Sequence, residues 1–162
     1  MGSYINKTNI MKYIAEKYRI KYLWRILKMS KELIMDNDFI SLWYYPETKI
    51  IHHEIKKYVF GTALQEMFVK GCDLMKEKGA KKWLSDDRNN SALTQKDTEW
   101  VVTVWLPKMI KNGWKYWAIV QPEKIIGQIN MKKFAQTNAE KGIVTKMFSD
   151  PDEAMKWLLE QK

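Results

Sequence analysis

The sequence predicts an α/β protein with a mixed β-sheet, and two observations lead to this fold class. Two β-rich runs stand next to each other near residue 46, which is typical of an antiparallel hairpin. After them, helix-like and strand-like patterns alternate to the end of the chain, and this alternation requires crossover helices between largely parallel strands. The expected order of elements is therefore ββαβαβαβα, with the helices packed on the sheet.

The hairpin is expected in FISLWYYPETKIIHHEI, where strands at 39–45 and 49–57 flank the connection 46–48. Thr62 and Gln65 then have the spacing of a capping box, which predicts the start of an amphipathic helix. Apolar residues recur at helical spacing beyond it, until a glycine ends the pattern: Leu64, Met67, Phe68, Cys72 and Met75.

The next strand and helix are expected between residues 81 and 113. KKWLSD at 81–86 is a short strand by composition. Thr94 and Asp97 form a second capping box, so the apolar run that follows is assigned to a helix that ends before Gly113. We expect Pro107 to kink this helix, because proline lacks the backbone N–H group that the helix needs.

The last third of the chain repeats the alternation. KYWAIVQ at 115–121 is typical of a buried strand, and the proline after it suits a helix start at 122–138. A glycine and an asparagine interrupt that helical pattern, which leaves open one helix or two short pieces. A strand at 142–148 and a terminal helix capped by Asp150 complete the prediction.

Length and composition indicate one globular domain with a basic extension before it. The chain has 162 residues, of which 46% are hydrophobic and 13% aromatic, enough for a single core. Residues 1–28 hold seven Lys or Arg against one Glu, which is +6 of the total charge of +9. The domain at 29–162 therefore gives no electrostatic reason to expect a nucleic-acid partner.

Three interpretations of the extension 1–28 stay open. Its basic, helix-like pattern with aromatic residues could lie on an anionic membrane surface. It could instead dock on the domain or on a partner. The third interpretation is that it is not part of the natural protein, because MSKELIMDND from Met29 resembles a translation start.

The expected compartment is the cytoplasm. One cysteine cannot form an internal disulfide, and the sequence shows neither a signal-peptide pattern nor an apolar run long enough to span a bilayer. Membrane contact is expected only through residues 1–28, if at all.

The sequence offers little support for catalysis. His52 and His53 are neighbours on an expected strand, so their side chains should point to opposite faces and cannot grip one ion. Cys72 lies on the apolar face of a helix, where a buried thiol is expected. Metal-ligand spacings, the nucleophile elbow, the phosphate loop and the dinucleotide fingerprint do not occur. We therefore expect no catalytic residue, no metal and no cofactor.

The candidate binding site is the loop that follows the strand 81–86. The carboxyl ends of parallel strands are where open α/β sheets usually bind ligands. One of the two aspartates is expected to pair with the arginine, and the alternative is that the loop side chains, Asn90 included, only cap turns. The residues expected to contact a partner or ligand are Asp86, Asp87, Arg88, Asn89, Ser91 and Trp100.

Tryptophans near this loop suggest a second possibility. Helical spacing places most of them in the core, but they could also line a pocket for an apolar small molecule. They are Trp83, Trp100, Trp105, Trp114 and Trp117.

Taken together, LSDDRN, the capped helix with Trp100 and Pro107, GWKYWAIV and FSDPDEAMKWL resemble the STAS-domain, SpoIIAA-like family, which is also compared with lipid-binding SEC14 domains. The similarity covers about Leu33 to Leu158. It implies a mixed sheet with helices and no catalytic residues. In the anti-sigma-factor antagonists it also implies a serine in an Asp-Ser-Ser/Thr-Gly turn that a partner kinase phosphorylates.

The chain departs from that signature, because DDRNNSA has no glycine after Ser91 and places two aspartates near it. The resemblance therefore carries over the fold but not the phosphorylation switch. The sequence predicts a non-catalytic binding module that uses the loop after strand 81–86 to engage a protein partner or a copy of itself. The alternative is a carrier or sensor of a lipid or other small apolar ligand.

Overall fold

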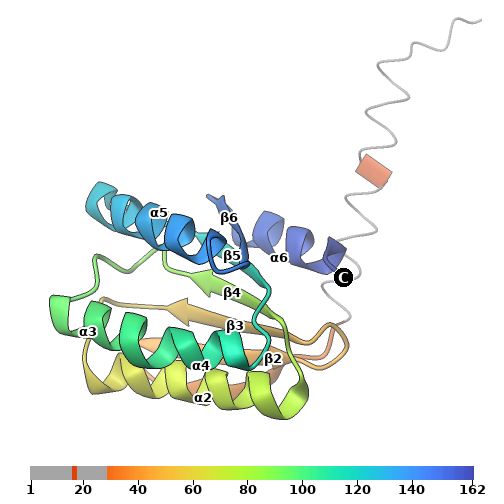
Figure 1. Ribbon diagram of the computed structural model, residues 1–162. Helices are drawn as coiled ribbons and strands as arrows, with labels where there is room; N and C mark the ends of the chain where they lie inside the picture. The colour runs from red at the N-terminus through yellow and green to blue at the C-terminus, as the bar shows by residue number, and fades with distance from the viewer. Residues whose placement is uncertain (1–15, 18–28) are drawn as a thin grey trace, which may run out of the picture. The chain divides into compact units, whose positions relative to one another are not determined.

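The computed structural model describes residues 16–17 and 29–162. The chain divides into two units, residues 1–30 and residues 31–162. In the first unit residues 16 and 17 are helical, and the other expectations for the extension lie outside the described residues. The fold below is that of residues 31–162 (Figure 1).

Six strands form one mixed sheet, which confirms the predicted fold class. The strands lie side by side in the order of the chain, β1-β2-β3-β4-β5-β6. The pairs β1–β2 and β2–β3 are antiparallel, whereas β3 to β6 are parallel. The strands are β1 (Glu32–Asp36), β2 (Ile40–Tyr45), β3 (Ile50–Ile55), β4 (Lys82–Asp86), β5 (Tyr116–Val120) and β6 (Val144–Phe148).

Strand β1 was not predicted, so the expected hairpin is a meander of three strands. Its five residues are exposed or half-buried, and its register with β2 shifts between Leu33 and Met35. A short edge strand with little burial leaves no clear alternation of apolar and polar residues in the sequence.

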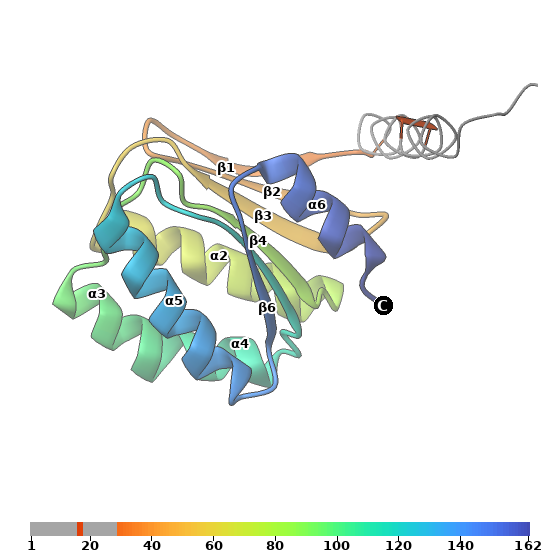
Figure 2. The same cartoon turned by 90° about the horizontal axis from the view of Figure 1, so that it is seen from above.

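The helices divide between the two faces of the sheet. They are α2 (Thr62–Lys78), α3 (Gln95–Trp100), the π-helical turn η1 (Val101–Trp105), α4 (Leu106–Lys111), α5 (Ile125–Ala139) and α6 (Pro151–Glu160). Each parallel connection steps across the sheet in the same direction, so right-handed crossovers place α2, α3–α4 and α5 on one face (Figure 2). Helix α6 packs on β4, β5 and β6 from the other face. Helix α5 is continuous, so the alternative of two pieces is wrong.

The disturbance expected at Pro107 takes the form of a π-helical turn. Helix α3, η1 and α4 follow one another without a break, and η1 ends two residues before the proline. The N–H group of Leu106 donates to the carbonyl of Val101, five residues earlier. The wider turn accommodates the missing donor of the proline within the helical segment.

One of the two predicted capping boxes is confirmed. The hydroxyl of Thr94 accepts from the N–H of Asp97 at 3.1 Å and caps α3. The box at Thr62 is wrong, because α2 has Gly61 as its N-cap residue without a side-chain cap, and Gln65 donates to Asp97 instead.

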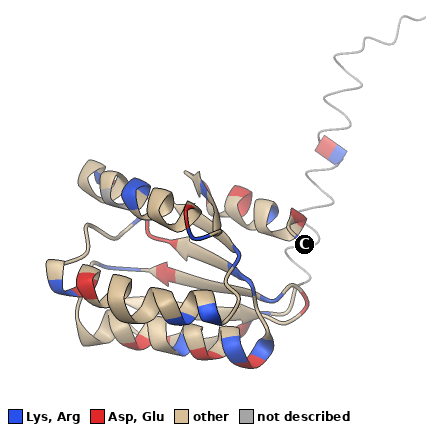
Figure 3. Cartoon of the chain, in the orientation of Figure 1, with Lys and Arg blue, Asp and Glu red and all other residues tan. Residues whose placement is uncertain are grey.

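Acidic and basic residues are interspersed over the helices and strands of the domain (Figure 3). The net charge of residues 31–162 is +3, since the net charge of the whole chain is +9 and that of residues 1–28 is +6.

Candidate functional site

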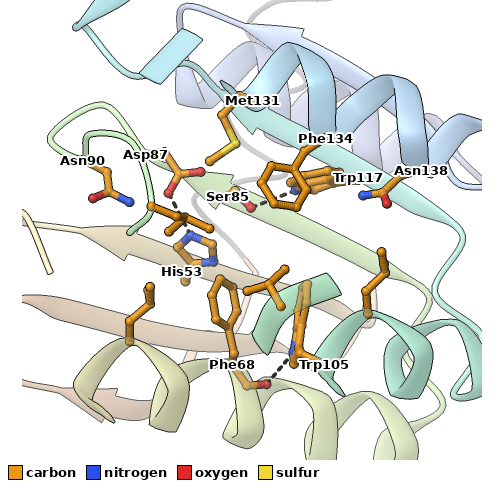
Figure 4. A pocket seen from close by; sticks show the side chains of 14 residues that line it. His53, Phe68, Ser85, Asp87, Asn90, Trp105, Trp117, Met131, Phe134 and Asn138 are labelled. Atoms are coloured by element: carbon orange, nitrogen blue, oxygen red, sulfur yellow. Dashed lines mark hydrogen bonds and ion pairs between the residues drawn. The ribbon is translucent and has the colours of Figure 1, made fainter. Parts of the chain in front are cut away.

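A cavity of about 40 Å³ lies between the sheet and the helices α2, η1 and α5, beneath the loop that follows β4 (Figure 4). Most of its wall is apolar: Leu64, Phe68, Leu93, Val101, Trp105, Leu106, Trp117, Met131 and Phe134. The polar side chains of its wall are His53, Ser85, Asp87, Asn90 and Asn138. Ligand sites in proteins usually combine an apolar wall with a few polar groups in this way.

Strand geometry explains why three of the polar groups meet in the floor of the cavity. His53 on β3 and Ser85 on β4 are register partners, so their side chains stand on the same face of the sheet. Asp87 follows Ser85 by two positions and keeps to that face, just past the end of β4. The loop is held there because the N–H of Asp87 donates to the carbonyl of Val120 at 3.1 Å.

A chain of hydrogen bonds fixes the state of His53. The indole N–H of Trp83 donates to Nδ1 of His53 at 2.9 Å, so Nδ1 carries no proton. The hydrogen of the neutral ring is then on Nε2, which donates to Oδ1 of Asp87 at 3.3 Å. The ring is also held edge-on against Phe68 and Trp83. His53 is therefore a neutral group that orients Asp87.

Ser85 is not arranged as a nucleophile. Its hydroxyl accepts a hydrogen bond from the indole N–H of Trp117 at 2.8 Å. Both ring nitrogens of His53 are already engaged by Trp83 and Asp87, so the ring has no nitrogen left to take a proton from the serine. The Ser-His-Asp composition of the cavity is thus not a catalytic triad.

Two amide oxygens in the cavity wall lack hydrogen-bond partners among the described residues. Asn90 lies in the loop after β4 and Asn138 lies in the last turn of α5, and both are almost fully buried. The Oδ1 atoms of both have no partner in the described part of the chain. Each such atom costs about 1–3 kcal/mol of stability, so these groups are not explained by the fold alone.

Buried polarity is concentrated at this cavity. Five of the eight buried polar or charged residues among those described line it, and the other three are Ser41, Asp86 and Asp97. Because burying polar groups is costly, such a cluster in one place indicates a site.

Asp86 faces the opposite side of the sheet from Asp87, as neighbours at a strand end do. Its carboxylate accepts from Nε and an Nη atom of Arg88 at 2.8 and 2.7 Å, and this pairing raises the pKa of Arg88. The expectation that one aspartate pairs with the arginine is confirmed. Both aspartates are buried, so the surface of the loop is formed by its other side chains.

The remaining residues of the predicted site lie apart from the cavity. Asn89 is exposed and Ser91 is half-buried on the loop. Trp100 is half-buried, stacks near Phe68 with a centroid distance of 6.5 Å and lines a shallow surface depression over α2. The structure therefore brings Asp87, but not Asn89, Ser91 or Trp100, to the wall of the cavity.

Of the five tryptophans considered for a pocket, Trp105 and Trp117 line the cavity. Trp83 and Trp114 stand behind them in a continuous aromatic cluster, with centroid distances of 5.2 to 6.4 Å. The indole N–H of Trp105 donates to the carbonyl of Phe68 at 2.9 Å, which ties η1 to α2.

His52 points to the face opposite His53, as predicted. Its Nδ1 lies 3.3 Å from the hydroxyl of Tyr45, and its Nε2 is buried without a partner among the described groups. Burial, and next the neighbouring His53, lower the pKa of His52 to about 3. The expected buried thiol is also present, since Cys72 is buried and burial raises its pKa.

A groove of about 240 Å³ lies directly against the cavity. It runs between η1, where Val102 forms its wall, and α5. Leu93, Leu106 and Phe134 line both spaces. The groove therefore marks the side from which a molecule would reach the cavity.

The sequence contained a signal for two of the missed residues. His53 shares a face of its strand with Ile51 and Ile55, and Ser85 shares a face of its strand with Trp83. At both positions the alternation of apolar and polar residues predicts an apolar side chain. Asn138 left no such signal, because the apolar pattern of α5 is irregular.

Over residues 16–17 and 29–162, the helices are too short or too polar to cross a membrane. Within the same residues no group of His, Cys, Asp and Glu is arranged to hold a metal ion. Comparisons with protein-family models, with curated proteins and with solved structures gave no match to this chain.

Proposed function

We propose that this chain is a non-catalytic binding module that carries or senses a small, mostly apolar ligand in the cavity beneath the loop after β4. The observation that carries this proposal is the pair of buried amide oxygens, of Asn90 and Asn138, that lack partners in an otherwise apolar cavity. A ligand that donates hydrogen bonds to them would offset the cost of their burial.

The resemblance to SpoIIAA-like and SEC14 proteins also supports a non-catalytic binding role. The mixed sheet with packed helices is the architecture that the resemblance implies, and family membership stays part of the proposal. The engagement of both nitrogens of His53 supports a binding role over a catalytic one.

The experiment is a titration with small probe molecules followed by ¹H–¹⁵N NMR of the indole N–H groups of Trp105 and Trp117. The probes are isobutanol, isobutylammonium and isobutyrate, which share one shape. We expect saturable shifts with at least one probe. Val101→Phe should abolish them by filling the cavity, because Val101 is buried in its wall.

The matched control is Val104→Phe, which makes the same change on the exposed side of η1 and should leave binding intact. Native mass spectrometry of freshly purified protein adds a second readout. Absence of any saturable shift together with a clean apo mass would overturn the proposal.

A second candidate function is self-association through the loop and the start of α5. Ile125, Ile126 and Ile129 are exposed there by 72%, 60% and 52%, an unusual grouping of large apolar side chains. The loop lies beside them, because the N–H of Glu123 donates to the carbonyl of Arg88 at 3.1 Å.

An apolar patch of this kind can pair with the same patch on a second copy about a two-fold axis. Sedimentation equilibrium should then show a dimer that the double variant Ile125→Ser, Ile126→Ser loses. The variant Val69→Ser, which removes an exposed apolar side chain on α2, should leave the dimer unchanged. A monomer at every concentration of the unmodified chain contradicts this function.

A further inference from the structure

The carboxyl group of Asp87 in the cavity indicates which class of ligand the cavity binds. Asp87 is buried, and no Lys or Arg is among the side chains that line the cavity. His53 does not neutralise it, because Nδ1 of the ring accepts from Trp83 and the ring is therefore neutral. Arg88, the next residue, is held by Asp86 on the other face of the sheet. A buried carboxylate without a cationic partner is costly unless a bound group supplies the positive charge.

The hydrogen bonding of the cavity side chains also favours a positively charged ligand. Oδ1 of Asp87 accepts a hydrogen bond from Nε2 of His53. Asn90 lies beside Asp87 in Figure 4, and its Oδ1 has no hydrogen-bond donor among the described residues. The cavity therefore offers acceptors that need donors. A primary ammonium group has three N–H donors and no acceptor, whereas a carboxylate ligand would add acceptors and repulsion.

The walls suit the remainder of such a ligand. Phe68, Trp105, Trp117 and Phe134 surround the cavity, and aromatic faces attract cations as well as alkyl groups. A cavity of about 40 Å³ exceeds the 10–15 Å³ that one water needs and suits about three to five heavy atoms.

We infer that the cavity binds a short primary alkylammonium ion, whose ammonium group pairs with Asp87 and Asn90 while its alkyl group lies against the aromatic walls. This inference rests on the proposed function, because it names the ligand class of the same cavity.

The test compares the three probes of one shape at pH 7 on the unmodified protein. We expect isobutylammonium, a cation at this pH, to bind at least about tenfold more tightly than isobutanol, because only the cation forms a charge pair with Asp87. Isobutyrate should not bind. This comparison needs no variant, so it does not depend on whether a substituted protein folds.

Two matched variants locate the effect. Asp87→Asn should reduce the affinity for isobutylammonium by about tenfold or more and leave that for isobutanol within about twofold. Asp86→Asn changes the neighbouring carboxylate, which faces the other side of the sheet, and should leave both affinities unchanged.

The outcomes separate this inference from the proposed function. Equal or tighter binding of isobutanol or isobutyrate overturns the ammonium ligand and leaves a ligand-binding cavity in place. Isobutylammonium binding that Asp87→Asn does not weaken also overturns the inference. Failure of all three probes overturns both.

Discussion

Asp97 accepts two hydrogen bonds from the backbone N–H of Gly61, at 3.1 and 3.0 Å, although the residues are 36 positions apart. Thr94 and Gln65 donate to the same carboxylate. Burial by itself would raise the pKa of Asp97, but these hydrogen bonds lower it below its ordinary value. The side chain of Asp97 thus connects the start of α2 to the start of α3 through hydrogen bonds.

We predict that Asp97→Ala lowers the free energy of unfolding by about 2–3 kcal/mol, because several charge-assisted hydrogen bonds at two helix starts are lost together. Urea denaturation measures this change. Asp73→Ala, an exposed acid on α2, serves as the control and should change stability by less than about 0.5 kcal/mol. An equal decrease in the free energy of unfolding in both variants would contradict this structural role of Asp97.

A second prediction concerns the contact between α2 and β4. A Cβ atom on Gly71 would lie 2.2 Å from Cη2 of Trp83, whose side chain is fully buried. We expect Gly71→Ala to destabilise the protein by about 1–3 kcal/mol through overpacking, which outweighs the gain of about 1 kcal/mol in helix propensity.

Thermal and urea unfolding measure the effect, and Lys76→Ala at an exposed position of α2 is the control. Gly71→Ala should cost less stability in a Trp83→Phe background than in the unmodified protein, because the smaller ring leaves room for the methyl group. A stability gain in the single variant would show that the helix and ring separate easily.

A third prediction is a pH dependence from His52. Its pKa is about 3 in the folded protein and 6.5 in the unfolded chain, so below pH 6.5 the unfolded chain binds a proton that the folded protein does not. The free energy of unfolding should therefore fall as the pH drops from 6.5 toward 3, by up to about 1.4 kcal/mol per pH unit. Above pH 6.5 His52 adds no dependence.

His52→Gln replaces the imidazole, which lies 3.3 Å from the hydroxyl of Tyr45, with an amide that does not titrate. Urea denaturation between about pH 7 and pH 5, above the range in which carboxylates titrate, should show a flatter fall for this variant. Parallel curves for the variant and the unmodified protein would rule out His52 as the source.

The fourth prediction separates a binding residue from a folding residue. Asn138→Leu removes a buried amide without a partner and keeps a similar volume, so we expect it to raise the free energy of unfolding by about 1–2 kcal/mol. Asn112→Leu is the contrast, because Asn112 donates to the carbonyl and sulfur of Cys72, and it should destabilise. A loss of stability in Asn138→Leu would mean that its amide supports the fold.

The sequence predicts much of the fold because most elements carry a strong local signal. Strand β5 and helix α2 are examples, since one is a continuous apolar run and the other repeats apolar residues at helical spacing. The predictions fail for elements that are stabilised by residues distant in the sequence. The start of α2 depends on Asp97, and β1 depends on pairing with β2 rather than on its own composition.

The sequence predicts a binding site at the loop after β4, and the cavity of the proposed function lies beneath that loop, where Asp87 is among the residues that line it. The sequence shows that Asp86 and Asp87 end a strand, yet not that Asp87 turns inward to His53 while Asp86 turns to Arg88. Which of two neighbouring acids meets a cavity depends on strand register and on the packing of α5, including Asn138. These tertiary contacts leave no pattern in the local sequence, so they could not be predicted from it.

The agreement between strand order and chain order also bears on how the protein is made. Each new strand joins the neighbour synthesised just before it, so the sheet can extend in step with the growing chain and no early strand must wait for a distant partner. Helix α6 follows β6 in the chain and packs across β4, β5 and β6, so it can dock only once these strands have paired.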